Sequence, residues 1–254
     1  MGFLDGPRPI AVAHRGGTES APENTVAAFR AAQAQGFRYL ETDVHLSADG
    51  VLVAFHDDVL DRVTDTSGAI ADLHSADIAA ARLGDGHTIP TFAELLETFP
   101  DARFNVDPKS DDSVVALVQT LRRHGAIDRV CIGAFSDQRL ARVRALAGPG
   151  LCTSAGPREI VRAAASSRVR PARRPAHHSL PYRCLQLPVR HRNVELVTPA
   201  LLEWAHDRGL QVHVWTIDDP VEMHRLLDLG VDGIMTDHPT VLRTVLESRH
   251  QWFS

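Results

Sequence analysis

Two histidines directly follow short apolar segments that are predicted to be strands. A side chain at the end of a strand is well placed to take up or release a proton. His14 comes directly after the apolar run 10–13 and is followed by Arg15, Gly16 and Gly17. An imidazole titrates near neutral pH, a guanidinium offers a planar fork of donors for phosphate oxygens, and glycine allows a sharp turn and a close ligand. His56 comes after a second apolar run. Because hydrolysis of a phosphodiester needs both a base and an acid, the two imidazoles are candidate catalysts.

Two carboxylates occur at alternate positions of the segment 39–46. Apolar and polar residues alternate there, which places Glu41, Asp43 and His45 on one face of a strand. Two carboxylates that face a low-dielectric interior repel each other unless a cation lies between them. A hard divalent cation with oxygen ligands suits this pattern. The alternative is a buried ion pair with an arginine or a lysine.

The segment 103–109 repeats this arrangement at the end of another predicted strand. Asn105, Asp107 and Lys109 share one face, and Pro108 ends the strand. We expect Asp107 to supply a third oxygen ligand and Lys109 to hold a phosphate. The alternative is an ordinary Asp107–Lys109 ion pair at a strand end.

Other polar and aromatic residues are weaker candidates. Trp215 shares a face with His213 by period two, so its indole is predicted either to line the substrate site or to pack in the core. Residues 166–183 hold five arginines and no acidic residue, and we expect a solvated loop on the face opposite the site. Arg190, His191 and Arg192 are expected on the active face, where they could help to bind an anionic substrate.

Short apolar runs alternate with segments of helical period along the whole chain. The predicted strands are 9–13, 39–46, 103–107, 130–134, 151–153, 184–188, 211–216 and 232–236, and the predicted helices are 23–35, 91–99, 112–124, 136–147, 157–165, 198–208, 219–229 and 239–248. Eight such units in 254 residues predict an α/β fold, a (β/α)8 TIM barrel. A hairpin and an irregular insertion, about 57–90, follow the second strand. No linker divides the chain, so residues 1–254 are expected to form a single domain.

Composition excludes some classes of function. A formal net charge of −5 argues against general nucleic-acid binding but not against a small anionic substrate. The three cysteines have no metal-type spacing, so we expect buried free thiols in a reducing cytoplasm. The first residues do not resemble a signal peptide, and no apolar run approaches the ~20 residues of a spanning helix. We therefore expect a cytoplasmic protein without stable membrane insertion, whose oligomeric state is left open.

Several ordered motifs together resemble the glycerophosphodiester phosphodiesterase family, specifically its small cytoplasmic branch. The resemblance covers about residues 9–246 and rests on His14-Arg15-Gly16, Glu23-Asn24-Thr25, Glu41-Thr42-Asp43, His56-Asp57, Asp107-Pro108-Lys109, Val214-Trp215-Thr216 and Gly233-Ile234-Met235-Thr236-Asp237. It implies a TIM barrel and metal-dependent hydrolysis of glycerophosphodiesters to sn-glycerol 3-phosphate and an alcohol.

The resemblance also implies a role for each matching residue. His14 and His56 become the acid/base pair, Arg15 and Lys109 hold the phosphate, and Mg²⁺ or Ca²⁺ is held by Glu41, Asp43 and Asp107.

Two positions leave alternatives open. The third metal ligand is more usually glutamate in this family, and Asp107 is shorter by one methylene. Asn24 matches the family's asparagine, but it also stands where a helix begins. For the whole chain, the alternatives are a phospholipase D-like hydrolase of lysophospholipids and a non-catalytic phosphate-binding barrel.

Overall fold

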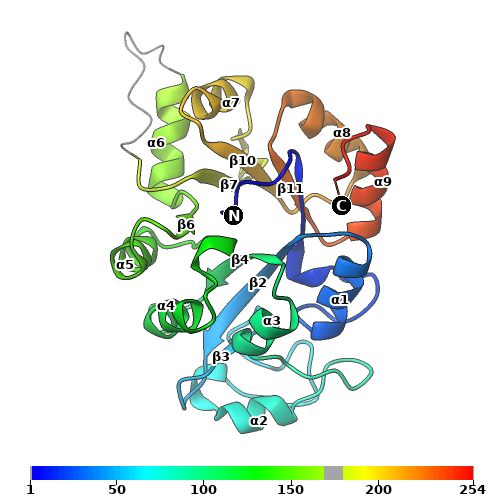
Figure 1. Cartoon of the computed structure of the whole chain (residues 1–254), viewed down its shortest axis with the longest axis vertical. Helices are drawn as coiled ribbons and strands as arrows, with labels where there is room; N and C mark the ends of the chain where they lie inside the picture. The colour runs from blue at the N-terminus through cyan, green and yellow to red at the C-terminus, as the bar shows by residue number, and fades with distance from the viewer. Residues whose placement is uncertain (1, 169–179, 254) are drawn as a thin grey trace.

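Eight parallel strands form a ring with helices around its outside (Figure 1). A computed structural model describes residues 2–168 and 180–253. The strands of the ring are β1 (Ile10–Ala13), β2 (Tyr39–Leu46), β4 (Arg103–Pro108), β5 (Val130–Ile132), β6 (Cys152–Thr153), β7 (Cys184–Pro188), β10 (Gln211–Trp215) and β11 (Gly233–Thr236). The expected (β/α)8 barrel is confirmed.

The ring runs in the order β6-β5-β4-β2-β1-β11-β10-β7. Its first and last strands in the sequence are neighbours, because Ala13 of β1 is in register with Thr236 of β11. Between β6 and β7 the pairing is a single parallel bridge from Ser154 to Cys184, with the Ala155 N–H donating to the Cys184 carbonyl at 2.9 Å. The seam between β6 and β7 is therefore the most weakly paired part of the ring.

The helices pack against the outer face of this ring. They are α1 (Val26–Ala34), α3 (Phe92–Thr98), α4 (Ser113–Arg123), α5 (Asp137–Ala147), α6 (Pro157–Ser167), α7 (Pro199–His206), α8 (Pro220–Leu229) and α9 (Pro239–Ser248). Four of them have a serine or threonine as N-cap. The side chains of Thr25, Thr91, Ser136 and Thr198 each accept a hydrogen bond from a backbone N–H of the first turn.

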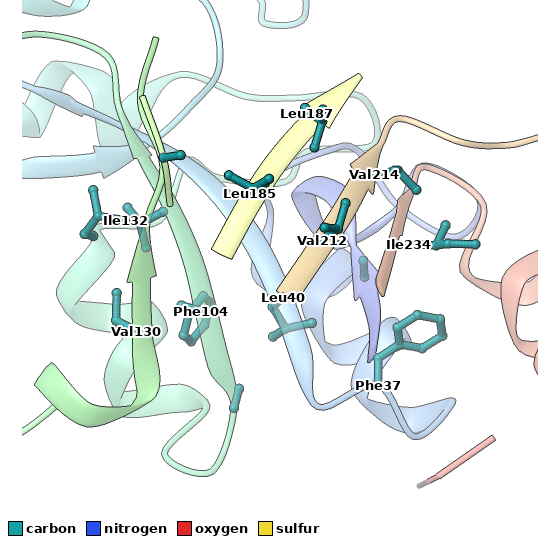
Figure 2. Close-up of a cluster of buried hydrophobic side chains, with 14 of the residues drawn as sticks. Phe37, Leu40, Phe104, Val130, Ile132, Leu185, Leu187, Val212, Val214 and Ile234 are labelled. Atoms are coloured by element: carbon teal, nitrogen blue, oxygen red, sulfur yellow. The ribbon is translucent and has the colours of Figure 1, made fainter. Parts of the chain in front are cut away.

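The main core lies between the strands and the helices. Alternate strand residues, among them Leu40, Phe104, Ile132, Val212 and Val214, have no more than 1% of their surface exposed. Figure 2 shows them on strands β2, β4, β5 and β10. Burying each such side chain contributes about 1.5–3 kcal/mol. The alternation then sends the polar residues between them, such as Glu41 and Asp43, into the ring.

A second lobe follows β2. Strand β3 (Leu52–Ala54) pairs antiparallel with β2, as the predicted hairpin requires. After it come the short helices η2 (Ile70–Asp72) and α2 (Ser75–Ala80), and Leu60, Ile70 and Ile78 centre a separate apolar cluster. The insertion thus has its own small core.

Some elements differ from the expectation. Strands β5 and β6 are shorter than predicted, and the chain after β7 forms an additional antiparallel pair, β8 (Arg190–His191) with β9 (Val194–Glu195). Arg190, His191 and Arg192 are exposed on this pair. Most of the arginine-rich stretch 166–183 lies outside the described residues. No helix among the residues described is both long and apolar enough to cross a membrane.

Candidate active site

The turn after β1 presents His14 and Arg15 at the carboxyl end of the barrel strands. Residues His14–Gly16 form one 3-10 turn, and the φ angles of Arg15, Gly16 and Gly17 are 53°, 84° and 85°. A Cβ on Gly16 would lie 2.8 Å from the backbone nitrogen of Phe29, and a Cβ on Gly17 would lie 2.5 Å from a ring carbon of Pro239. The two glycines therefore let the turn pack against α1 and α9.

His14 is held between two carboxylates. Its Nδ1 donates to Asp237 Oδ1 at 2.6 Å, and its Nε2 lies 3.8 Å from Glu41 Oε2. Burial alone would lower the pKa of His14, but the charges of Glu41 and Asp237 outweigh it and raise that pKa. Asp237 follows β11, the neighbour of β1, and its own pKa is lowered, because the bond to His14 outweighs the effect of burial. The pair is therefore arranged to hold a proton on His14.

Glu41 and Asp43 project into the barrel from β2, and less than 5% of either residue is exposed. The Arg15 backbone N–H donates to Glu41 Oε2 at 3.0 Å. Burial and the nearby Asp43 charge raise the pKa of Glu41 to about 7. Asp43 accepts a hydrogen bond from Asn24 Nδ2 at 3.4 Å, and Asn24 in turn accepts one from Thr42 Oγ1 at 2.8 Å.

Lys109 lies between the carboxylates of two adjacent strands. Asp43 of β2 is in register with Asp107 of β4, and Lys109 Nζ is 2.6 Å from Asp43 Oδ1 and 3.0 Å from Asp107 Oδ2. The ion pair considered as an alternative is thus present. Asp107 Oδ1 is nevertheless buried without a hydrogen bond. Burial outweighs the Lys109 charge and raises the pKa of Asp107.

His56 is placed by the hairpin of β2 and β3. The Phe55 N–H donates to the Asp43 carbonyl at 3.1 Å, and His45 Nε2 donates to the His56 carbonyl at 3.1 Å. The side chain of His56 is one-third exposed, and its Nδ1 donates to Asp57 Oδ1 at 2.6 Å. Like His14, it has one ring nitrogen bound to an aspartate.

Arg62 of the insertion joins the two halves of the site. Its guanidinium contacts Asp57 and donates to Glu23 Oε1 at 2.6 Å, and Glu23 also accepts from Arg15 at 3.1 Å. A continuous chain of ion pairs therefore links His56 to the turn after β1.

Trp215 lies at the end of β10 and is partly exposed. Its indole packs against the cluster inside the barrel and meets the ring of Phe135 edge-on, with centroids 5.6 Å apart. Phe135 is 71% exposed. The two rings form an apolar wall beside the strand ends. The packing in the barrel that was one expectation for Trp215 is therefore present, and its place in a substrate site stays a prediction.

The structure brings six of the predicted site residues into one connected group: His14, Arg15, Glu41, Asp43, Asp107 and Lys109. His56 joins them through Arg62, and Trp215 stands apart. Sequence reasoning did not predict that Asp237 and Asp57 bind the histidines, that Arg62 links His56 to the turn after β1, or that Phe135 packs on Trp215. Asp57 could have been found as the neighbour of His56, whereas Asp237 becomes a partner only when the ring closes.

Comparisons with known proteins identify the family that this chain resembles. Residues 14–241 match the model of the Glycerophosphoryl diester phosphodiesterase family. The probable glycerophosphodiester phosphodiesterase 2 of Mycobacterium tuberculosis is 41% identical over 247 residues, which cover 96% of this chain and 92% of that protein. The human lysophospholipase D GDPD1 is 28% identical, over 93% of this chain and 86% of its own.

A solved structure shares the fold. It is a phosphodiesterase from Oleispira antarctica in complex with the product sn-glycerol-3-phosphate, with a TM-score of 0.78 and 26% identity over 94% of this chain and 97% of that chain. Together with the match across the barrel, these relatives show that the chain belongs to the glycerophosphoryl diester phosphodiesterase family, and hence to the phosphoric diester hydrolases.

Proposed function

We propose that this enzyme uses a divalent cation and two histidines to hydrolyse glycerophosphodiesters to sn-glycerol 3-phosphate and an alcohol. The observation that carries the proposal is the matched pair His14 and His56. The Nδ1–H of each imidazole donates a hydrogen bond to an aspartate, so the Nε2 atom is left to take up or release a proton. One histidine takes a proton from the nucleophile, and the other gives one to the departing alkoxide.

The nucleophile is either water or a hydroxyl of the substrate's own glycerol. In the first case, the P–O bond to the alcohol breaks as the water oxygen bonds to phosphorus. In the second, a cyclic phosphate forms first and water then opens it. The raised pKa of His14 and its buried bond to Asp237 suit the donor of a proton. We therefore assign His14 to the leaving group and His56, which is more exposed to water, to the nucleophile.

The donor set inside the barrel fits a hard divalent cation. Glu41, Asp43 and Asp107 offer only oxygen, and Asp107 Oδ1 is buried without a partner. Among the described residues these three carboxylates do not converge as a ready-made cluster, since the Lys109 ammonium lies between two of them. When bound, Mg²⁺ or Ca²⁺ would polarise the phosphoryl oxygens and stabilise charge at phosphorus.

Arg15 and Lys109 are proposed to bind the phosphate. Arg15 Nε is buried without a hydrogen bond, at 3.4 Å from Asp43 Oδ2, so the guanidinium has a donor to spare. With Asp43 and Asp107 engaged by a cation, the Lys109 ammonium would be available to contact a phosphate oxygen. These contacts orient the diester between the two imidazoles.

A second candidate activity is the hydrolysis of lysophospholipids. The wall of Phe135 and Trp215 supports it, because the mostly exposed Phe135 ring beside the strand ends could contact an acyl chain. The resemblance to a human lysophospholipase D supports it too.

The deciding experiment is a product assay. We expect purified enzyme with Mg²⁺ or Ca²⁺ to release sn-glycerol 3-phosphate from glycerophosphocholine, and EDTA to abolish the release. Lysophosphatidylcholine, presented in parallel, separates the two activities. No product from any of several glycerophosphodiesters under metal-replete conditions would refute the proposal, and full activity in EDTA would refute its metal-dependent part.

A further inference from the structure

Three cysteine thiols that are far apart in the sequence converge inside the barrel. They are Cys131 of β5, Cys152 of β6 and Cys184 of β7, and all three are free. Their sulfur atoms lie within 4.8 Å of one another, with Cys131 Sγ and Cys184 Sγ 3.9 Å apart. At most 9% of any of these residues is exposed.

Barrel register explains the convergence. Cys131 is directly in register with Cys152, and Cys184 takes part in the bridge that joins β6 to β7. In-register residues of parallel strands point to the same face, so these thiols face inward together. No linear motif marks such a site, because each cysteine belongs to a different β/α unit.

This thiol cluster is separate from the hydrolytic site. Between them, Gln186 Nε2 crosses the barrel to donate to Asn105 Oδ1 at 2.9 Å. Asn105 is in register with Cys131 and precedes Asp107 by two positions on β4. On its other side the cluster packs with Phe3 and Met235. The thiols are therefore bounded by a hydrogen-bonded amide pair on one side and by apolar side chains on the other.

We propose that Cys131, Cys152 and Cys184 form a binding site for a soft d¹⁰ cation, with Cu(I) as the ion that fits best. Thiolates select soft ions such as Cu(I), whereas carboxylates select Mg²⁺ and Ca²⁺. Three sulfurs placed around a metal at about 2.3 Å in one plane are about 4.0 Å apart, close to the spacing already present. Binding displaces thiol protons to solvent, and no electron is transferred.

Coordination number favours Cu(I) over Zn²⁺. Structural zinc takes four ligands, and among the described residues the cluster offers three His, Cys, Asp or Glu donors. Hydrogen bonds to the two neighbouring thiols lower the pKa of Cys152, whereas burial raises the pKa of Cys131. A three-coordinate monovalent ion therefore matches the cluster.

The site spans the weakest seam of the ring. Strand β6 has two residues and reaches β7 through one bridge, so few hydrogen bonds hold this sector. A metal bound to β5, β6 and β7 together would cross-link that seam. Because a ligand that binds only the folded state stabilises it, we expect Cu(I) to raise the melting temperature.

The experiment titrates reduced full-length protein with Cu(I) under anaerobic conditions, in competition with a Cu(I) chelator. Copper is added both to folded protein and during refolding from denaturant, so that slow entry is not mistaken for lack of a site. The readouts are the copper-to-protein ratio, the copper X-ray absorption spectrum and the melting temperature. Zn²⁺ is titrated in parallel.

Matched variants assign the ligands. We expect one copper per chain with sulfur-only ligation, and loss of that copper in Cys131→Ser, Cys152→Ser and Cys184→Ser, each checked for a cooperative melt. Asp107→Asn should keep the copper. The triple Cys→Ala variant should keep phosphodiesterase activity, which separates this proposal from the hydrolytic one.

Three results would overturn the proposal. One is absence of stoichiometric copper by both routes of addition. Another is copper that remains bound in the triple variant, which would place it elsewhere. The third is tighter retention of Zn²⁺ than of Cu(I).

Discussion

At the scale of single residues, the site depends on aspartates that hold histidines in place. Asp237 and Asp57 each accept the Nδ1 hydrogen of an imidazole at 2.6 Å. A carboxylate in this position selects the tautomer and stabilises the charged ring. For His14, the Asp237 carboxylate also helps to raise the pKa of the imidazole, so a single substitution at Asp237 can change that pKa.

Replacing either imidazole is expected to remove one proton-transfer step. General acid or base catalysis contributes about 10²–10⁴ in rate, so His14→Ala and His56→Ala should each lower kcat by about that factor. Thermal melts check that both variants fold, and His224→Ala, on the outer helix α8, is a control expected to keep its activity. Near-normal turnover in both active-site variants would contradict the assignment.

The charge of Asp237 is expected to set the pH dependence that His14 controls. The pKa of His14 is raised because the charges of Glu41 and Asp237 outweigh burial. Asp237→Asn removes one of these charges, so the pKa falls and the corresponding limb of the pH–rate profile moves to lower pH. The other limb of the profile should stay in place. A profile that moves upward, or both limbs moving together, would contradict this role.

Metal affinity is expected to depend on the protonation of Glu41. Burial and Asp43 raise its pKa to about 7, so the metal-free protein loses stability as pH rises from the ordinary 4.5 toward that value. A ligand must lose its proton to bind metal. Calorimetric titration with Ca²⁺ should therefore show affinity falling by up to about tenfold per pH unit below pH 7. An affinity unchanged across this range would argue against Glu41 as a ligand.

At the scale of elements, strand ends and their turns place the reactive groups. The turn after β1 places the strictest limits on residue type, because Arg15, Gly16 and Gly17 all have positive φ and the turn packs against α1. Strand β2 contributes both carboxylates because its alternation sends them inward. The insertion contributes His56 and the Arg62 link.

A pair of glycine variants can separate backbone strain from crowding. Gly16 and Gly50 have similar φ angles of 84° and 82°, but a Cβ on Gly16 meets the backbone of α1 at 2.8 Å, whereas a Cβ on Gly50 meets nothing within 4 Å. Gly50→Ala should cost about 1–2 kcal/mol of stability and leave activity intact. Gly16→Ala should cost more and lower kcat as His14 shifts. Equal effects of the two variants would contradict the packing argument.

The elements differ in how well the sequence predicts them. The strand bounds at 39–46 and 184–188 were predictable because alternation or a short apolar run marks them. The β8–β9 pair was not, because two-residue strands carry no periodic signal. The inward face of Glu41 and Asp43 followed from period two. The link through Arg62 did not, since its irregular segment has no repeat from which a direction can be read.

At the scale of the whole molecule, ring closure brings together groups that no local pattern connects. Asp237 reaches His14, and the three thiols meet, only because strands distant in the sequence become neighbours. For this reason the spacing of the cysteines predicted free buried thiols correctly but not their convergence.

The contact between β1 and β11 is expected to be sensitive to added volume. A Cβ on Gly233 would lie 2.5 Å from Ile10 Cγ1 and 3.1 Å from the Ile10 carbonyl oxygen. Gly233→Ala should therefore lower stability by about 1–3 kcal/mol and reduce activity by displacing Asp237 from His14. Gly150→Ala, whose Cβ finds its nearest contact at 3.7 Å, is the matched control. Equal melting temperatures for the two variants would contradict the prediction.

The pairing of the first strand with the last also fixes when the site can be completed. His14 and its partner Asp237 are 223 positions apart, so the bond between them closes one of the longest loops in the chain. Contacts between such distant residues form late, because the entropy of the intervening chain opposes them. During synthesis, His14 lacks its Asp237 partner until the last strand has emerged from the ribosome. Catalytic competence would therefore arise only in the final stage of folding, which makes hydrolysis a direct reporter of the fully assembled barrel.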